Sequence, residues 1–140
     1  WPKNENSLES ISLPNSLTYV GGGYSGKLTT TAISWENGYY LGNSENPYLF
    51  FGGVIDNTTT EMTLHPNTKI IGPSAFENCT SLKSIKFSNN LKKIGIGAFR
   101  KAALEIINLP DTIEYLGTDA FWFCNSLKTL FSFQVMLRIL

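Results

Sequence analysis

A short motif that recurs three times constrains the fold of this chain more than any other feature. The motif reads aliphatic-Gly-x-x-Ala-Phe and occupies residues 71–76, 94–99 and 116–121, at spacings of 23 and 22 residues. Self-similarity at a period of 20–50 residues is the signature of a repeat protein, in which each unit buries its apolar face by stacking on its neighbours. The sequence therefore predicts a solenoid of stacked coils, with the phenylalanine of each motif in one interior column. These phenylalanines are Phe76, Phe99 and Phe121.

A strand pattern follows each motif, for instance at residues 82–87. Its apolar side chains alternate with polar ones, which predicts that Ile85 and Phe87 point inward while Ser84 and Lys86 point outward. Stacking would bring the outward side chains of successive coils into one row, and a continuous row of this kind is a candidate ligand-binding surface. The alternative is a solvated sheet face without a ligand. The residues of the predicted row are Ser12, Thr63, Lys86 and Asn108.

The motif itself predicts a tight turn. Ser74 and Asp119 are suitable N-caps for a short helical turn that includes the Ala-Phe pair. Gly72, Gly95 and Gly117 stand just before that turn, where we expect a backbone conformation that is costly for other residues. The predicted coil therefore combines a short strand, a tight turn and a return segment.

The two cysteines occupy equivalent positions, three residues after the phenylalanines of the first and third motifs. Equivalent residues of stacked coils repeat at the strand spacing, so Cys79 and Cys124 should lie about 9–10 Å apart. A disulfide needs Cα atoms within about 7 Å. We expect both cysteines to act as small buried hydrophobic residues.

The segment before the regular repeats is irregular. Residues 28–35 and 48–51 are β-prone, Asn37-Gly38 is a turn signal, and Gly52-Gly53 is predicted to end the second strand. Two degenerate repeats would fit within residues 20–71. We expect one domain over residues 1–140, with irregular repeats at 7–70 and regular repeats at 71–140.

The composition excludes several classes of partner. The net charge is zero and only 16% of residues are charged, which argues against a general nucleic-acid binder and against a polybasic membrane-surface segment. No apolar run approaches the roughly 20 residues that span a bilayer. The chain opens on Trp1, without methionine or signal peptide, and we interpret it as a mature or excised fragment.

The residues that catalysis or metal binding would need are sparse. The chain has one histidine, His65, and its place beside Pro66 predicts a turn residue. The carboxylates are scattered, and no second cysteine or histidine lies near either cysteine to complete a metal site. The glycines of residues 21–26 lack the full phosphate-loop pattern. We expect no catalytic residues, no metal and no cofactor.

The repeat Ile-Gly-x-x-Ala-Phe-x-x-Cys-x-x-Leu-x-x-Ile-x-Phe/Leu-Pro resembles the BspA-like leucine-rich repeats of bacterial surface proteins. The stretch Asn37–Leu49 also looks like a segment found between such repeats. The resemblance implies a mostly β solenoid, with a parallel sheet on one face and short helical turns or short strands on the other. It also implies a secreted or surface-attached protein that binds proteins, possible ligands being host extracellular-matrix or cell-surface proteins.

The resulting hypothesis is a non-enzymatic adhesion or protein-interaction module. One rival is a carbohydrate-binding module that uses the aromatic residues of 35–51, with Trp35 and Tyr39 as tentative ligand-binding residues. Trp122, one residue after a predicted core phenylalanine, is a further candidate anchor. A structural spacer within a longer protein is the other rival. Self-association is also a hypothesis, because the C-terminal coil is apolar and lacks a polar cap.

Overall fold

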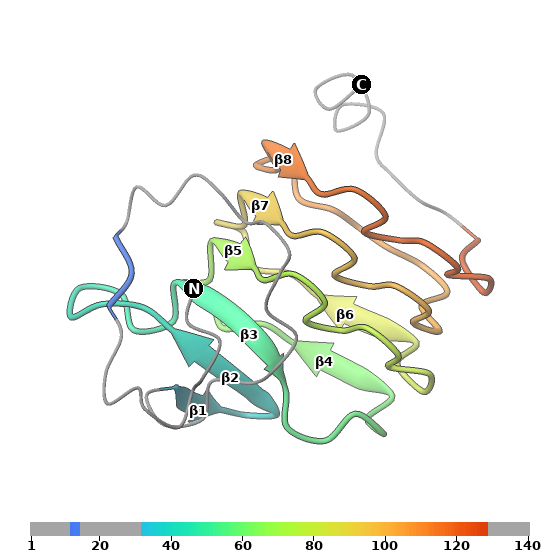
Figure 1. Ribbon diagram of the computed structural model, residues 1–140, viewed down its shortest axis with the longest axis horizontal. Coiled ribbons are helices and arrows are strands. Elements are labelled where there is room, and N and C mark those ends of the chain that lie inside the picture. The colour runs from blue at the N-terminus through green and yellow to red at the C-terminus, as the bar shows by residue number, and fades with distance from the viewer. Residues whose placement is uncertain (1–11, 15–31, 129–140) are drawn as a thin grey trace.

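The computed structural model describes residues 12–14 and 32–128, and the chain there consists of strands joined by turns (Figure 1). No helix occurs within these ranges. The strands are β1 Ile33–Trp35, β2 Gly38–Leu41, β3 Phe50–Val54, β4 Glu61–Thr63, β5 Ile70–Ile71, β6 Ser84–Lys86, β7 Lys93–Ile94 and β8 Tyr115–Leu116. The apolar C-terminal coil, on which the self-association hypothesis depends, lies mostly outside the described residues.

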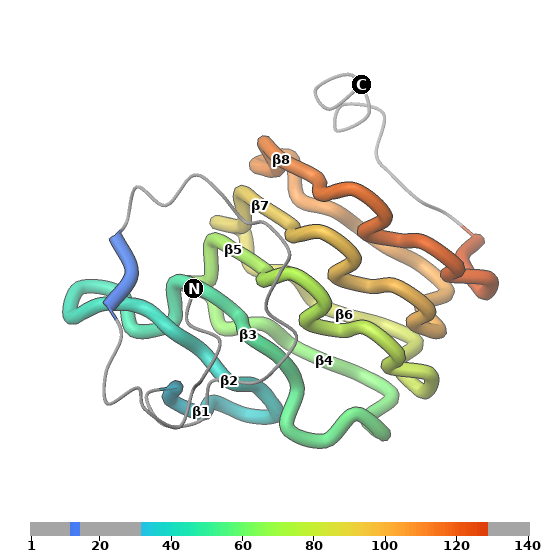
Figure 2. The backbone as a smooth tube through the Cα atoms, in the orientation of Figure 1, coloured from blue at the N-terminus to red at the C-terminus, as the bar shows by residue number. Residues whose placement is uncertain are grey.

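Two sheets enclose the core. The larger sheet has the order β1-β2-β3-β5-β7-β8, in which the first three strands are antiparallel and the strands from β3 onward are parallel. The smaller sheet is the parallel pair β4-β6. Figure 2 shows the chain after β4 as similar coils laid one on another. The coil of β4 and β5 and the coil of β6 and β7 each contribute one strand to each sheet, and the apolar residues of both sheets meet in one buried cluster.

The phenylalanine column is confirmed. The rings of Phe76 and Phe99 stack with centroids 4.8 Å apart and planes 3° apart, and Phe99 stacks on Phe121 at 5.3 Å and 6°. Phe51 of β3 extends the column by stacking on Phe76 at 4.7 Å. Phe51, Phe76 and Phe99 are fully buried. The column therefore begins in the segment that precedes the regular repeats.

The predicted helical turns are not confirmed. Each motif forms consecutive hydrogen-bonded turns, for example Ala75 N–H to the Gly72 carbonyl and Cys79 N–H to the Phe76 carbonyl. The third residue of each turn has positive φ, as type II turns require, and Ser74 and Asp119 both have φ of 57°. A left-handed residue is not an N-cap, because the N-cap residue has an extended backbone. The positive-φ residues of these turns are Ser74, Asn78, Gly97, Lys101, Asp119 and Phe123.

The expected reason for glycine at these motif positions is wrong. Neither Gly95 nor Gly117 has a left-handed backbone. A Cβ on Gly95 would lie 2.6 Å from the Pro73 nitrogen of the preceding coil, and a Cβ on Gly117 would lie 2.4 Å from the Ile96 nitrogen. These glycines are required because neighbouring coils approach too closely for a side chain.

The first two strands form an antiparallel hairpin where the first of two degenerate coils was expected. β1 pairs with β2 through a turn at Glu36-Asn37, one residue before the predicted turn. β2 pairs with β3, and β3 then pairs in parallel with β5 of the first regular coil. The prediction that Gly52-Gly53 ends the strand is wrong, because β3 continues to Val54. The hairpin thus extends the larger sheet at its N-terminal side.

Cys79 and Cys124 form no disulfide with each other. Cys79 is buried, whereas Cys124 is only half-buried and its Sγ donates a hydrogen bond to the Phe99 carbonyl at 3.0 Å. Burial raises the pKa of the Cys124 thiol. Cys79 is thus a small buried residue, as expected. Cys124 differs from the expectation because it is partly exposed and its thiol forms a hydrogen bond.

Candidate interaction surface

The smaller sheet presents part of the predicted outward row. Thr63 of β4 and Lys86 of β6 are register partners, and both are exposed. The next coil keeps this register, because Lys83 N–H donates to the Thr60 carbonyl at 2.9 Å and Glu105 N–H donates to the Lys83 carbonyl at 3.1 Å. Asn108 stands three residues after Glu105, as Lys86 does after Lys83, and it is exposed. Thr63, Lys86 and Asn108 therefore form one row across three coils.

A second outward row runs beside the first. Glu61 is the register partner of Ser84, and Ile106 occupies the same place in the next coil with 51% of its surface exposed. Met62 and Ile107, which alternate with these residues, are buried. Glu61 and Ile106 were not predicted from the sequence, although the same alternation identifies them. The face thus carries an acid, a base, polar groups and one exposed aliphatic side chain. We call these six residues the row surface: Glu61, Thr63, Ser84, Lys86, Ile106 and Asn108.

Ser12 does not join the row surface. Leu13 N–H donates to the Gly42 carbonyl at 3.0 Å, and the Asn43 side chain donates to the Leu13 carbonyl at 2.8 Å. Leu13 packs against Leu41 and Leu49, so this segment lies beside the loop that follows β2. Ser12 lines a shallow open hollow there with Pro14, Asn43, Ser44 and Glu45. Its position in the predicted row is wrong.

The aromatic candidates Trp35 and Tyr39 lie on the hairpin and are half-buried. Trp35 packs against the core and meets the His65 ring edge-on, with centroids 4.9 Å apart. Tyr48 covers His65 from another side, stacked flat at 3.6 Å. The Trp35 ring is thus engaged in packing. Sugar binding by Trp35 and Tyr39 remains a prediction.

His65 is a turn residue, as predicted, but its ring has a second role in packing. Its carbonyl accepts from Thr68 N–H at 3.0 Å, its Nδ1 accepts from Asn67 N–H at 3.0 Å, and its own N–H donates to the Tyr40 hydroxyl at 3.1 Å. Burial lowers the pKa of His65 and raises the pKa of Tyr40 to about 12. Both groups are therefore neutral at pH 7 and serve the packing of the hairpin against the first coil.

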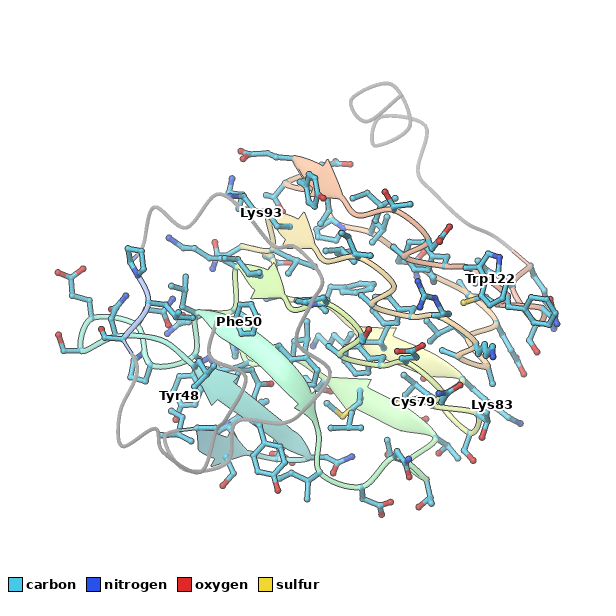
Figure 3. The ribbon with its side chains drawn as sticks, in the orientation of Figure 1. Tyr48, Phe50, Cys79, Lys83, Lys93 and Trp122 are labelled. Atoms are coloured by element: carbon cyan, nitrogen blue, oxygen red, sulfur yellow. The ribbon has the colours of Figure 1, made fainter. Side chains whose placement is uncertain are left out.

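Trp122 lies on a turn of the last described coil, at the side of the molecule that also carries Cys79 and Lys83 and away from Tyr48 (Figure 3). It is 47% exposed, and its neighbour Phe123 is 58% exposed. The guanidinium carbon of Arg100 lies 5.9 Å from the indole centroid and Lys101 Nζ lies 5.7 Å from it, within reach of cation–π attraction. Phe123 was not predicted from the sequence.

Among residues 12–14 and 32–128, no group of three or more His, Cys, Asp or Glu side chains is placed to hold a metal ion. Within the same part of the chain, no helix has the length and apolarity that a bilayer crossing requires.

Residues 50–138 match the family described as the BspA type leucine rich repeat region, with 6 copies of the repeat. The chain belongs to the BspA-type leucine-rich repeat family. No curated protein matches it in sequence.

Solved structures of leucine-rich repeat proteins are similar to the chain. One, from Eubacterium ventriosum, shares 22% identity at a TM-score of 0.63, over 89% of this chain and 36% of that chain. Another, a leucine rich cell surface protein from Faecalibacterium prausnitzii, shares 25% identity at a TM-score of 0.49, over 51% of this chain and 19% of that chain. The likeness to the first supports the leucine-rich repeat fold. The chain spans well under half the length of either protein.

Proposed function

We propose that this chain is a non-enzymatic protein-interaction module of a secreted or surface-attached bacterial protein, and that the row surface contacts its protein ligand. The observation that supports the proposal is the in-register row of Thr63, Lys86 and Asn108, exposed on three successive coils. A row held by backbone pairing presents its side chains at fixed spacing, which lowers the conformational entropy lost on binding. The family resemblance of the repeat supports a surface location.

A charge reversal in the row tests the proposal. The probe is a panel of immobilised extracellular-matrix proteins, with binding measured by surface plasmon resonance. Lys86→Glu should weaken the binding of any ligand found by roughly tenfold, since it replaces the ammonium group with a carboxylate, which repels the acidic groups that Lys86 would attract. The matched control is Lys69→Glu, because Lys69 is also exposed but precedes β5 of the other sheet. Equal losses in both variants would contradict a role for the row surface.

The two rivals predict different results. A carbohydrate-binding module would bind a glycan array and lose that binding on Tyr39→Ala, with no effect of Lys86→Glu. A spacer would bind no panel member when the longer protein carrying this segment does bind one. Either result would replace the proposed function.

A further inference from the structure

Two aromatic side chains are exposed together on the third motif turn. Trp122 and Phe123 are adjacent, with ring centroids 4.9 Å apart and planes inclined at 45°. Of the described large apolar side chains that are exposed, these two are neighbours in both sequence and space. Exposed aromatic pairs of this kind are typical of interaction sites, where tryptophan is among the most frequent anchors.

The same turn in the two preceding coils shows what is unusual here. The equivalent pairs are Glu77-Asn78 and Arg100-Lys101, which are charged or polar. The second residue is left-handed in all three coils, with φ of 62° at Asn78, 61° at Lys101 and 62° at Phe123. Asparagine tolerates this conformation, whereas a bulky residue such as phenylalanine rarely adopts it. Phe123 therefore combines a backbone conformation that is rare for phenylalanine with exposure of its ring.

Lys101 supplies the charge beside this pair. Arg100 already has two carboxylate neighbours, Glu77 at 3.4 Å and Asp119 at 3.8 Å. Lys101 is exposed, and none of the described carboxylates forms an ion pair with it. Its ammonium nitrogen lies 5.7 Å from the centroid of the Trp122 indole, so a positive charge that no described carboxylate pairs with stands beside this ring.

We propose that Lys101, Trp122 and Phe123, here called the turn patch, dock a protein segment that carries an apolar side chain next to an aspartate or glutamate. The apolar side chain would contact the two inclined rings, and the carboxylate would pair with the Lys101 ammonium. Charge complementarity favours an acidic occupant, because the nearby carboxylates Glu77 and Asp119 pair with Arg100, and no described carboxylate pairs with Lys101. The turn patch lies on motif turns and shares no residue with the row surface, so it goes beyond the proposed function.

The chain itself offers variants that remove the patch without disturbing the turn. Asn78 occupies the same left-handed position in the first motif, so Lys101→Asn and Phe123→Asn should fold normally. The probe is a set of immobilised 12-residue peptides with a central Leu or Phe flanked by Asp or Glu, and matched peptides with Lys or Ser at the flanks. Binding is measured by surface plasmon resonance at low and high salt, after circular dichroism has confirmed the fold of each variant.

Acidic apolar peptides should bind in preference to both matched sets. Phe123→Asn should weaken this binding by at least roughly tenfold. Lys101→Asn should weaken it less and reduce its dependence on salt. Lys86→Glu in the row surface should leave it unchanged, so that failure of the proposed function and failure of this inference are distinguishable.

Three results would overturn the inference. The first is no peptide binding by the folded protein, or equal binding of acidic, basic and neutral sets. The second is binding that Phe123→Asn leaves unchanged. The third is a dimer, seen by light scattering and lost in Phe123→Asn, which would show that a second copy of the chain occupies the patch.

Discussion

Replacement of Gly95 by alanine tests how closely the coils are packed. Gly95 does not have a left-handed backbone, so conformational freedom alone predicts that alanine stabilises the fold by about 0.4–1 kcal/mol. The close packing of the coils predicts instead that alanine destabilises the fold. The new Cβ would lie 2.6 Å from Pro73 N and 2.8 Å from Gly72 C, both backbone atoms, whereas ordinary contacts begin at 3.4 Å.

The geometry also sets the size of the effect. Relief of the clash needs the two coils to separate by about 0.8 Å, and this would stretch the 2.8 Å hydrogen bond from Gly95 N–H to the Ile71 carbonyl. Overpacking costs about 1–3 kcal/mol, and we expect the upper end, about 3 kcal/mol, because neither backbone can rotate away. For a chain of this size the midpoint of thermal unfolding should fall by about 10 °C.

Urea and thermal unfolding followed by circular dichroism provide the assay. The matched control is Gly52→Ala in β3, where the nearest atom to the added Cβ would be the Tyr39 carbonyl oxygen at 3.6 Å. We expect this control to change the free energy of unfolding by less than about 1 kcal/mol. A Gly95→Ala variant as stable as the natural chain would refute the reasoning, because it would show that the coils can separate at no cost.

Two further predictions concern the column and the histidine. Phe99 stacks on two rings and is fully buried, so Phe99→Ala should lower the free energy of unfolding by about 4 kcal/mol in urea denaturation. Phe121 is half-buried, so Phe121→Ala should lower the free energy of unfolding by only about 2 kcal/mol. Equal losses of stability in the Phe99→Ala and Phe121→Ala variants would contradict the position of the column at the centre of the core. The pKa of His65 is lowered by burial, so the unfolded chain binds its proton more readily and stability should decline as pH falls through 6.5. NMR titration should give a pKa below 6.5, His65→Asn should lose this pH dependence, and a value at or above 6.5 would contradict the packing of the ring.

The alternation of apolar residues predicted a large part of the site. Thr63, Lys86 and Asn108 were placed in one row because a strand directs successive side chains to opposite faces. Ser12 matched the same pattern but lies elsewhere, since backbone hydrogen bonds hold Leu13 against the loop after β2. A local pattern shows which face a side chain occupies, but it does not show which neighbour the strand pairs with.

The left-handed turn positions could not be predicted from residue type. Asn78 is a residue that favours positive φ, but Lys101 and Phe123 are not, and they adopt it because the coil below imposes its path. Lys101 N–H donates to the Trp122 carbonyl at 2.8 Å, as Asn78 N–H donates to the Arg100 carbonyl at 2.9 Å. Hydrogen bonds between coils thus override local preference and turn Phe123 toward solvent.

The repeat period alone determined that the coils stack and that Phe76, Phe99 and Phe121 meet, because a unit this small can bury its phenylalanine only against a neighbouring unit. Only the tertiary structure showed the antiparallel hairpin at the N-terminal side and the position of Ser12. It also showed that Gly95 is required by the close approach of the preceding coil. Each of these depends on contacts between segments far apart in sequence, where pairing and close approach of backbones outweigh local propensity.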